Sequence, residues 1–199
     1  MYPVPRVSAE HLAARRRQIV EAARRCFLRE GFHRTTMQDV IAEAGLSVGA
    51  VYRYFPSKAD LINAIAEEAV GGAEEVLAGI ARQEPPVPLI EALGRVLAYV
   101  ETQAGDEGVL RIAIQVWGEA QRDPALATFV AGKYAGFRHH FEVLVRRAQR
   151  GGEIPADADA EAVAAALFAL VPGWFLQLIL TGAPDRDTYL AGVRALLGR

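Results

Sequence analysis

Residues 35–61 read TTMQDVIAEAGLSVGAVYRYFPSKADL and predict two short helices in direct succession. Thr36 and Asp39 have the spacing of a capping box, in which each side chain bonds the other's backbone N–H at the start of a helix. Gly45 suits the left-handed residue that follows a helix, and Ser47 suits the cap of the next one. The stretch therefore predicts a helix of about eight residues, a tight glycine turn and a second short helix.

The second of these helices covers about residues 47–54 and ends before Pro56, which cannot continue a helix. Its first turn contains Gly49, which costs about 1 kcal/mol of helix stability relative to alanine. We expect this thin turn to let the backbone approach another molecule closely. Val51 and Phe55 are four residues apart, so they should point together into a core.

Helical periodicity extends through nearly the whole chain, and no convincing alternating strand pattern is present. We therefore expect an all-α protein. A first helix over residues 10–30 should brace the two short ones, with Cys26 on its apolar face as a packing residue. The remaining helices are expected at residues 57–83, 88–104, 107–121, 124–150, 158–181 and 185–197.

Charge is distributed unevenly along the 199 residues, although the net charge is only −2. Residues 1–58 carry 10 Lys/Arg against 5 Asp/Glu, a charge of +5, whereas the remainder carries 12 against 19, a charge of −7. The first third can therefore meet a polyanion that the rest would repel. A single cysteine and an N-terminus without a signal-peptide pattern predict a cytoplasmic protein.

Residues 162–180, AVAAALFALVPGWFLQLIL, are uncharged and nearly long enough to span a bilayer. Alanine dominates the first half, Pro172 and Gly173 interrupt the middle, and Gln177 is polar. We therefore interpret the segment as a helix buried in a core or a subunit interface and expect no membrane partner.

Catalytic chemistry finds little support in the sequence, which has no HExxH, CxxC or phosphate-binding glycine loop. His139 and His140 are adjacent and diverge by about 100 degrees on a helix, so they cannot readily share a metal ion. We expect no enzyme activity, no metal site and no cofactor.

Two short helices joined by a glycine turn and braced by a longer helix form a helix-turn-helix, whose second helix fits the major groove of DNA. Val48 can touch a thymine methyl group, and Tyr52 and Tyr54 carry hydroxyls that can bond phosphate oxygens. Arg53 and Lys58 add positive charge. The same pattern also fits a purely structural three-helix unit in which the tyrosines pack, and the residues alone leave both interpretations open.

A family resemblance favours the DNA-binding interpretation. Residues from about 15 to 67, with GF, then TTMQDVIAEAGLSVGAVYRYF, then PSKADL, resemble the N-terminal DNA-binding domain of TetR-family transcriptional regulators. The resemblance implies that residues 47–54 are the recognition helix, with Val48 and Gly49 near bases. It also implies phosphate or base contacts by several flanking residues. The full predicted DNA-binding set is Thr35, Thr36, Gln38, Ser47, Val48, Gly49, Tyr52, Arg53, Tyr54 and Lys58.

The resemblance further implies a homodimer joined by its last two helices and a pocket for a small molecule in the C-terminal part. The predicted dimer residues are Leu167, Val171, Phe175, Leu178, Tyr189, Val193 and Leu196. The predicted pocket residues are Tyr99, Ile114, Trp117, Tyr134, Phe137, Phe141 and Trp174. Their apolar character suggests a hydrophobic or aromatic effector.

The expected domains are a flexible arm at residues 1–14, a helix-turn-helix DNA-binding domain at 15–60, and a helical effector-binding and dimerisation domain at 61–199. We expect a ligand-responsive regulator, a repressor whose dimer binds a palindromic double-stranded DNA operator until an effector releases it. The alternative is a small-molecule-binding helical protein or enzyme whose N-terminal unit is only structural.

Overall fold

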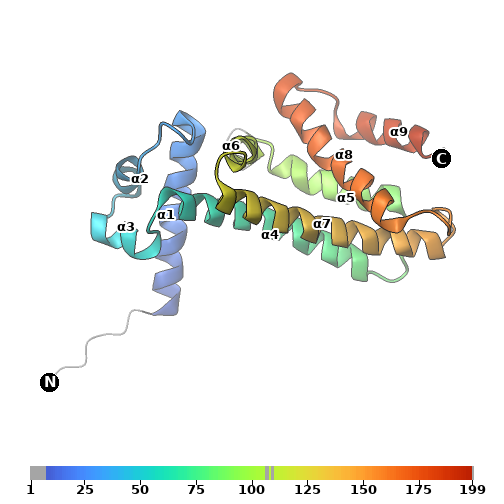
Figure 1. The fold of residues 1–199 in the computed structure, drawn as a ribbon, viewed down its shortest axis with the longest axis horizontal. Coiled ribbons are helices and arrows are strands. Elements are labelled where there is room, and N and C mark those ends of the chain that lie inside the picture. Colours follow the sequence, from blue (N-terminus) through green and yellow to red (C-terminus); the bar gives the residue numbers. More distant parts are fainter. Residues whose placement is uncertain (1–7, 106–107, 109, 199) are drawn as a thin grey trace.

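The computed structural model describes residues 8–105, 108 and 110–198, and all regular elements in this part of the chain are helices (Figure 1). The helices are α1 (Ala9–Glu30), α2 (Met37–Ala44), α3 (Val48–Tyr54), α4 (Lys58–Arg82), α5 (Leu89–Thr102), α6 (Leu110–Ala120), α7 (Pro124–Arg150), α8 (Ala160–Thr181) and α9 (Arg186–Leu196). The predicted all-α class is confirmed, and the predicted helix ends lie within a few residues of the observed ones.

The predicted caps are confirmed in the helix-turn-helix. The Thr36 hydroxyl accepts a hydrogen bond from the Asp39 backbone N–H at 3.2 Å, and an Asp39 carboxylate oxygen accepts one from the Thr36 N–H at 2.8 Å. Gly45 adopts the left-handed conformation, with φ 63° and ψ 31°. The Ser47 hydroxyl accepts from the Ala50 N–H at 3.3 Å and so starts α3.

Two hydrophobic cores lie along the molecule, and α4 belongs to both. The N-terminal core joins α1, α2 and α3 to the first turns of α4 and to parts of α6 and α7. The C-terminal core joins the last turns of α4 to α5, α7, α8 and α9. As Figure 1 shows, α3 lies at one end of the elongated molecule, and α8 and α9 lie towards the other.

The predicted domain boundaries differ from the structure at two points. Ser8 caps α1, which begins at Ala9, so residues 9–14 are helical rather than part of a flexible arm. Residues 1–7 of that predicted arm lie outside the described residues. Leu61, Ile62 and Ile65 pack in the N-terminal core, so that core extends past the predicted boundary at residue 60.

Within the described part of the chain, α8 is the one helix long and apolar enough to cross a membrane. Length and composition alone meet this test, which core helices of other proteins also pass. One side of α8 packs Leu167, Trp174 and Phe175 into the C-terminal core, while Leu180 near its end is 70% exposed.

Candidate DNA-binding surface and effector cavity

The outer face of α3 presents two large apolar side chains to solvent. Val48 is 59% exposed and Tyr52 is 44% exposed, and their four-residue spacing puts both on one side of the helix. Val51 and Phe55 occupy the opposite side and are buried in the N-terminal core, as predicted. The buried pair therefore fixes the rotation of α3 and determines which residues face outward.

Gly49 stands in open space on this surface. A Cβ atom built at Gly49 would meet no other atom of the protein within 4 Å. Packing therefore does not require glycine here, and neither does the helical backbone. Glycine at this position therefore leaves the backbone of α3 bare on its exposed face.

The other predicted DNA contacts occupy different environments around α3. Gln38 and Arg53 are exposed, and none of the described carboxylates lies within ion-pair distance of Arg53. Thr36 and Ser47 are exposed, but their hydroxyls already serve as helix caps. Tyr54 is partly buried against the N-terminal core. Arg53 is thus an available cation beside the exposed face of α3.

Thr35 does not belong to this surface, so its prediction as a phosphate contact is wrong. Its side chain is only 1% exposed. The hydroxyl donates towards the backbone oxygens of Gly31 at 2.9 Å and Cys26 at 3.2 Å. Thr35 instead fixes the chain as it leaves α1.

Lys58 has a structural role that the sequence did not reveal. Its ammonium group donates to the backbone oxygens of Phe32 at 2.8 Å and Thr35 at 2.9 Å, and it lies 4.2 Å from the centre of the Phe32 ring. Burial lowers the pKa of this amine. Lys58 therefore ties the start of α4 to the α1–α2 connection, and its predicted phosphate contact would use the remaining N–H.

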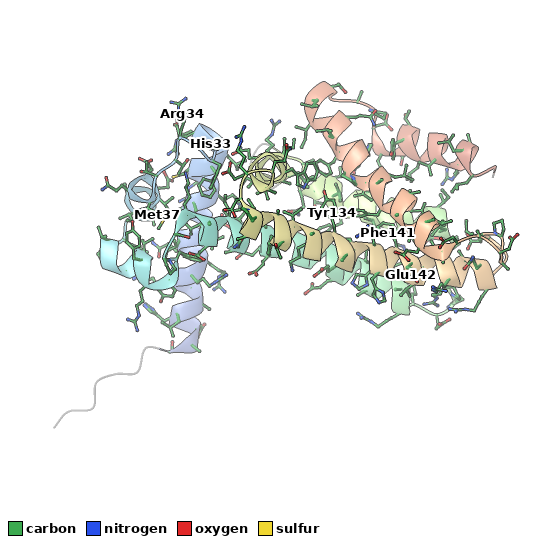
Figure 2. All side chains as sticks on the ribbon, in the orientation of Figure 1. His33, Arg34, Met37, Tyr134, Phe141 and Glu142 are labelled. Atoms are coloured by element: carbon green, nitrogen blue, oxygen red, sulfur yellow. The ribbon has the colours of Figure 1, made fainter. Side chains whose placement is uncertain are left out.

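Much of the positive charge of the N-terminal domain is paired internally. Arg25 and Arg29 both bind Glu43, at 2.7 and 3.4 Å, and Arg24 binds Glu21 at 2.8 Å. Arg34 extends outward from the α1–α2 connection (Figure 2). The formal charge of this domain consequently overstates the number of cations free to meet a polyanion.

Residues 45–49, GLSVG, match the letters of the nucleophile-elbow pattern GxSxG, so the expectation that this pattern is absent from the sequence is wrong. That motif needs a strand before the serine and an exposed hydroxyl above a sheet. Here α2 precedes Ser47, whose hydroxyl caps α3. The match is therefore one of letters only.

In the described part of the chain, no three His, Cys, Asp or Glu side chains gather to hold a metal ion.

A cavity of about 150 Å³ lies inside the C-terminal domain, between α4, α5, α6, α7 and α8. Five of the predicted pocket residues line it, namely Tyr99, Trp117, Tyr134, Phe137 and Phe141. Tyr134 and Phe141 come from successive parts of α7 (Figure 2). Burial raises the pKa of both Tyr99 and Tyr134, so these phenols stay neutral. Among the residues that the structure describes, no charged side chain belongs to the lining.

Two predicted pocket residues lie elsewhere. Trp174 is fully buried, and its indole N–H donates to the Pro184 oxygen at 3.1 Å while the ring packs near Tyr189. Ile114 packs against the C-terminal core and lines no described cavity. Both positions are apolar and helical, so the sequence pattern did not distinguish core from cavity wall.

The sequence analysis missed the contribution of α8 to the cavity. Phe168, Val171 and Phe175 line it, although Val171 and Phe175 were predicted at the dimer interface. The Tyr99 hydroxyl occupies the space that a Cβ at Gly72 would need, so this glycine admits Tyr99 between α4 and α5. The adjacent glycines Gly71 and Gly72 of α4 are the local sequence feature that accompanies this close approach.

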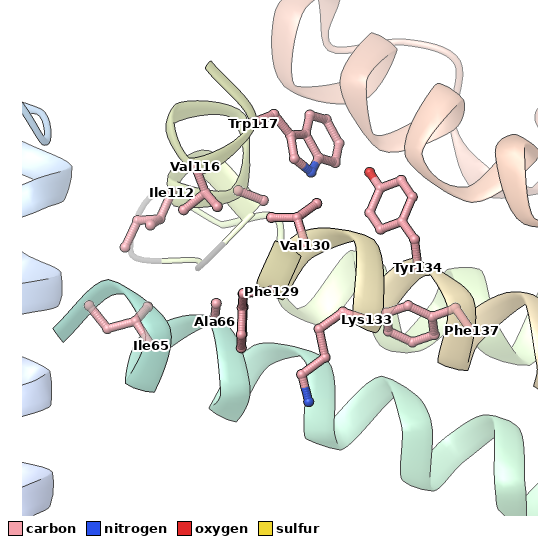
Figure 3. Close-up of a pocket in the computed structure, with 11 residues that line it drawn as sticks. Ile65, Ala66, Ile112, Val116, Trp117, Phe129, Val130, Lys133, Tyr134 and Phe137 are labelled. Atoms are coloured by element: carbon pink, nitrogen blue, oxygen red, sulfur yellow. The ribbon is translucent and has the colours of Figure 1, made fainter. Parts of the chain in front are cut away.

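A second cavity, of about 80 Å³, lies between α4, α6 and α7, nearer to the N-terminal domain (Figure 3). It shares Trp117, Tyr134 and Phe137 with the larger cavity. Its other side includes Ile65, which is part of the N-terminal core. The same aromatic side chains therefore face both spaces.

Helix α6 connects the cavities to the DNA-binding domain. Trp117 faces both cavities, and Gln115, two residues earlier, holds the end of α1. The Gln115 side-chain oxygen accepts from the Phe32 N–H at 2.7 Å, and its amide group donates to the Phe27 oxygen at 3.5 Å. A shift of α6 would therefore act on both the cavities and the α1–α2 connection.

The predicted dimer residues divide between the core and the surface. Leu167, Val171, Phe175 and Val193 are buried within the subunit, so they present little surface to a partner. Leu178 and Tyr189 are partly buried, and the Tyr189 hydroxyl donates to the Leu170 oxygen at 2.9 Å. Leu196 is 84% exposed, and Leu180, which was not predicted, is 70% exposed.

Comparisons with known proteins agree on one family. Residues 19–65 match the family model "Bacterial regulatory proteins, tetR family", and residues 91–199 match "BetI-type transcriptional repressor, C-terminal". The chain is 29% identical over 199 residues to the HTH-type transcriptional repressor BepR of Brucella suis biovar 1, covering 92% of this chain and 89% of that protein.

Two further matches cover different shares of the molecule. The HTH-type transcriptional repressor Rv1474c of Mycobacterium tuberculosis is 39% identical over 90 residues, 43% of this chain and 48% of that protein, so the match spans about half of that relative. The structure of Salmonella enterica GusR aligns with a TM-score of 0.77 and 26% identity, over 98% of this chain and 100% of that chain.

Proposed function

Because the chain belongs to the tetR family of bacterial regulatory proteins and is a helix-turn-helix transcriptional regulator, we propose that it is a ligand-responsive repressor. In this proposal a homodimer binds a palindromic operator and leaves it when a small apolar or aromatic effector fills the C-terminal cavity. A cytoplasmic location accompanies this role, since the operator lies on the bacterial chromosome.

The observation that carries the proposal is that α6 contacts both the cavity and the DNA-binding domain. Trp117 forms part of the cavity wall, while Gln115 is bonded to the chain at the end of α1. An effector that displaces α6 therefore changes the support of the DNA-binding domain. Helix α4 gives a second connection, because its first turns pack in the N-terminal core and its last turns pack in the C-terminal core.

Helix α3 is proposed to read the major groove. Exposed Val48 is suited to a thymine methyl group, and the bare backbone at Gly49 allows α3 to come close to the base edges. Tyr52, Arg53 and the N-terminus of α2 are proposed to bind phosphates and set the register. In a two-fold dimer, two copies of α3 would meet half-sites roughly 34 to 36 Å apart.

We propose that the subunits meet through the exposed apolar side of α8 and the end of α9. This surface includes Leu180 and Leu196, together with the exposed alanines Ala162, Ala166 and Ala169. Small residues let two helices approach closely, and large exposed apolar residues favour burial against a partner. The dimer face is therefore the side of α8 opposite to the predicted Leu167 and Phe175.

The effector is proposed to be apolar because the described lining of the 150 Å³ cavity is aromatic and aliphatic except for Gln103 and carries no charge. An engineered apolar cavity of about this volume holds a benzene molecule. The larger cavity alone thus has room for a single aromatic ring or a short aliphatic group.

Operator binding tests the proposal through Arg53. Duplexes from the DNA upstream of the protein's own coding sequence are titrated at several salt concentrations, beside a scrambled duplex of the same composition. The native duplex should bind more tightly. Arg53→Gln should lower its affinity about ten-fold and reduce the slope of log K against log salt by about one.

The matched control is Arg138→Gln, because Arg138 is an exposed arginine on α7 of the C-terminal domain. This variant should keep both the wild-type affinity and the wild-type salt slope. Equal binding of native and scrambled duplexes by every variant would contradict the regulator proposal.

A further inference from the structure

The lining residues that the two cavities share all belong to α6 and α7. Trp117, Tyr134 and Phe137 line both spaces, and Figure 3 shows them in the wall of the smaller one. The Tyr134 ring meets the Phe168 ring edge-on, with centroids 4.9 Å apart. Within the described part of the chain nothing accepts a hydrogen bond from the Tyr134 hydroxyl, so turning this ring breaks no hydrogen bond. The partition can open at the cost of side-chain packing alone.

Neither space is large on its own. The larger one, about 150 Å³, matches a single aromatic ring, and the smaller one, about 80 Å³, holds less. An elongated molecule fits only if it passes the Tyr134 partition and occupies both. Such a molecule would reach from α8 to Ile65, which is packed in the N-terminal core.

Of the described residues that line the two cavities, Lys133 alone is charged. Its side chain leaves α7 towards α4, away from Trp117, and its ammonium nitrogen lies 5.7 Å from the centre of the Phe129 ring (Figure 3). The side chain is half-buried, and none of the described carboxylates lies within ion-pair distance of it. A cation at the edge of an apolar cavity is stabilised when an anion pairs with it, and the apolar part of the same molecule can fill the cavity.

Resting on the proposed regulator function, we propose that the effector is an elongated apolar monoanion. Its apolar part passes the Tyr134 partition into the larger cavity, and its anionic head pairs with Lys133 at the outer end of the smaller one. Carboxylates with an aryl or alkyl chain belong to this class. Length is then decisive, because only a molecule that occupies both spaces pushes α6 away from Ile65 of α4.

The probes are ω-phenylalkanoates of increasing chain length and the primary alcohols of the same lengths. Binding to the full-length protein is measured by titration calorimetry, and release is measured as loss of operator duplex. Above a threshold length, the carboxylate should bind at least about ten-fold more tightly than its alcohol and should release the duplex. Shorter carboxylates should do neither.

Three variants isolate the role of Lys133. Lys133→Met keeps the apolar stem and removes the charge, so it should abolish the preference for carboxylate over alcohol while leaving alcohol affinity unchanged. Lys133→Arg should retain the preference. Arg138→Met removes an exposed cation five residues further along α7 and should leave both affinities as in wild type.

The inference is overturned if alcohols bind as tightly as carboxylates, if no probe binds, or if Lys133→Met loses the alcohol as well. The last result would make Lys133 a packing residue. Binding of native against scrambled duplex is measured on the same samples without probe. Retained operator preference together with failed probe binding rejects the monoanion while leaving the regulator proposal intact, whereas lost operator preference rejects the regulator proposal itself.

Discussion

Gly49 is expected to lower the stability of α3 while allowing DNA to come close to its backbone. An alanine methyl group at this position meets no atom within 4 Å, so the folded protein accepts it without strain. Gly49→Ala should therefore raise stability by up to about 1 kcal/mol and the melting temperature by about 2 to 4 °C. It should weaken operator binding about ten-fold or more, because the methyl group would stand between the backbone and the base edges.

The matched control for this prediction is Gly79→Ala in α4. Gly79 is also helical, exposed and without neighbours within 4 Å of a built Cβ. This variant should gain similar stability and keep full operator affinity. Thermal unfolding and duplex titration measure the two effects, and unchanged operator affinity in Gly49→Ala would remove the argument for close approach.

For single residues, the sequence predicted helix caps better than it predicted which side chains are buried or bonded within the protein. Thr36 and Ser47 were recognised as caps because the capping pattern is local in sequence. Thr35, one residue earlier, is buried, and its hydroxyl donates to the backbone oxygens of Cys26 and Gly31. The position of these oxygens depends on how α1 packs, which the local sequence does not show. Lys58 bonds Phe32, 26 residues away, and no local pattern encodes that contact.

At the scale of the helix, α2 depends on its capping box. The Thr36 hydroxyl satisfies the Asp39 backbone N–H, so Thr36→Ala should lower the free energy of unfolding by about 1 kcal/mol. Operator affinity should fall with it, since α2 supports α3. Chemical denaturation followed by circular dichroism measures the first effect, and an unchanged unfolding midpoint would show that the cap contributes nothing measurable.

The same capping box predicts an acid dependence. Hydrogen bonds from the Thr36 N–H and hydroxyl lower the pKa of the Asp39 carboxyl below its ordinary value of 3.8. The resulting stabilisation is fully present above the ordinary pKa and is lost as the pH falls through the lowered one. Asp39→Asn should therefore be less stable than wild type near neutral pH, and the difference should shrink in acid.

Helix α8 shows why an element can be predicted while its orientation is not. Its bounds were predicted closely, because Asp159 caps its start and Gly182 ends it. Its buried side could not be predicted, because a helix that is apolar on all sides carries no periodic signal of which side is buried. Val171 and Phe175 consequently line the cavity instead of a dimer interface.

At the scale of the whole molecule, exposed apolar side chains gather at two ends. Among the described residues, the large exposed hydrophobics are Leu12, Val48, Tyr52, Leu180, Leu196 and Leu197. Val48 and Tyr52 lie on α3, and the three C-terminal leucines lie on α8 and α9 or just after them. Apart from Leu12 on α1, these exposed side chains lie on the surfaces proposed to meet DNA and the second subunit.

This distribution predicts that the C-terminal surface holds the dimer together. Leu180→Glu and Leu196→Glu each place a charge where two subunits would bury apolar area, so each variant should sediment as a monomer where wild type sediments as a dimer. Leu12→Glu, at an exposed leucine on α1, should remain dimeric. The monomers should also lose most of their operator affinity, because each half-site must then be bound separately. Dimers that persist in both C-terminal variants would place the interface on another face and leave these leucines without an assigned partner.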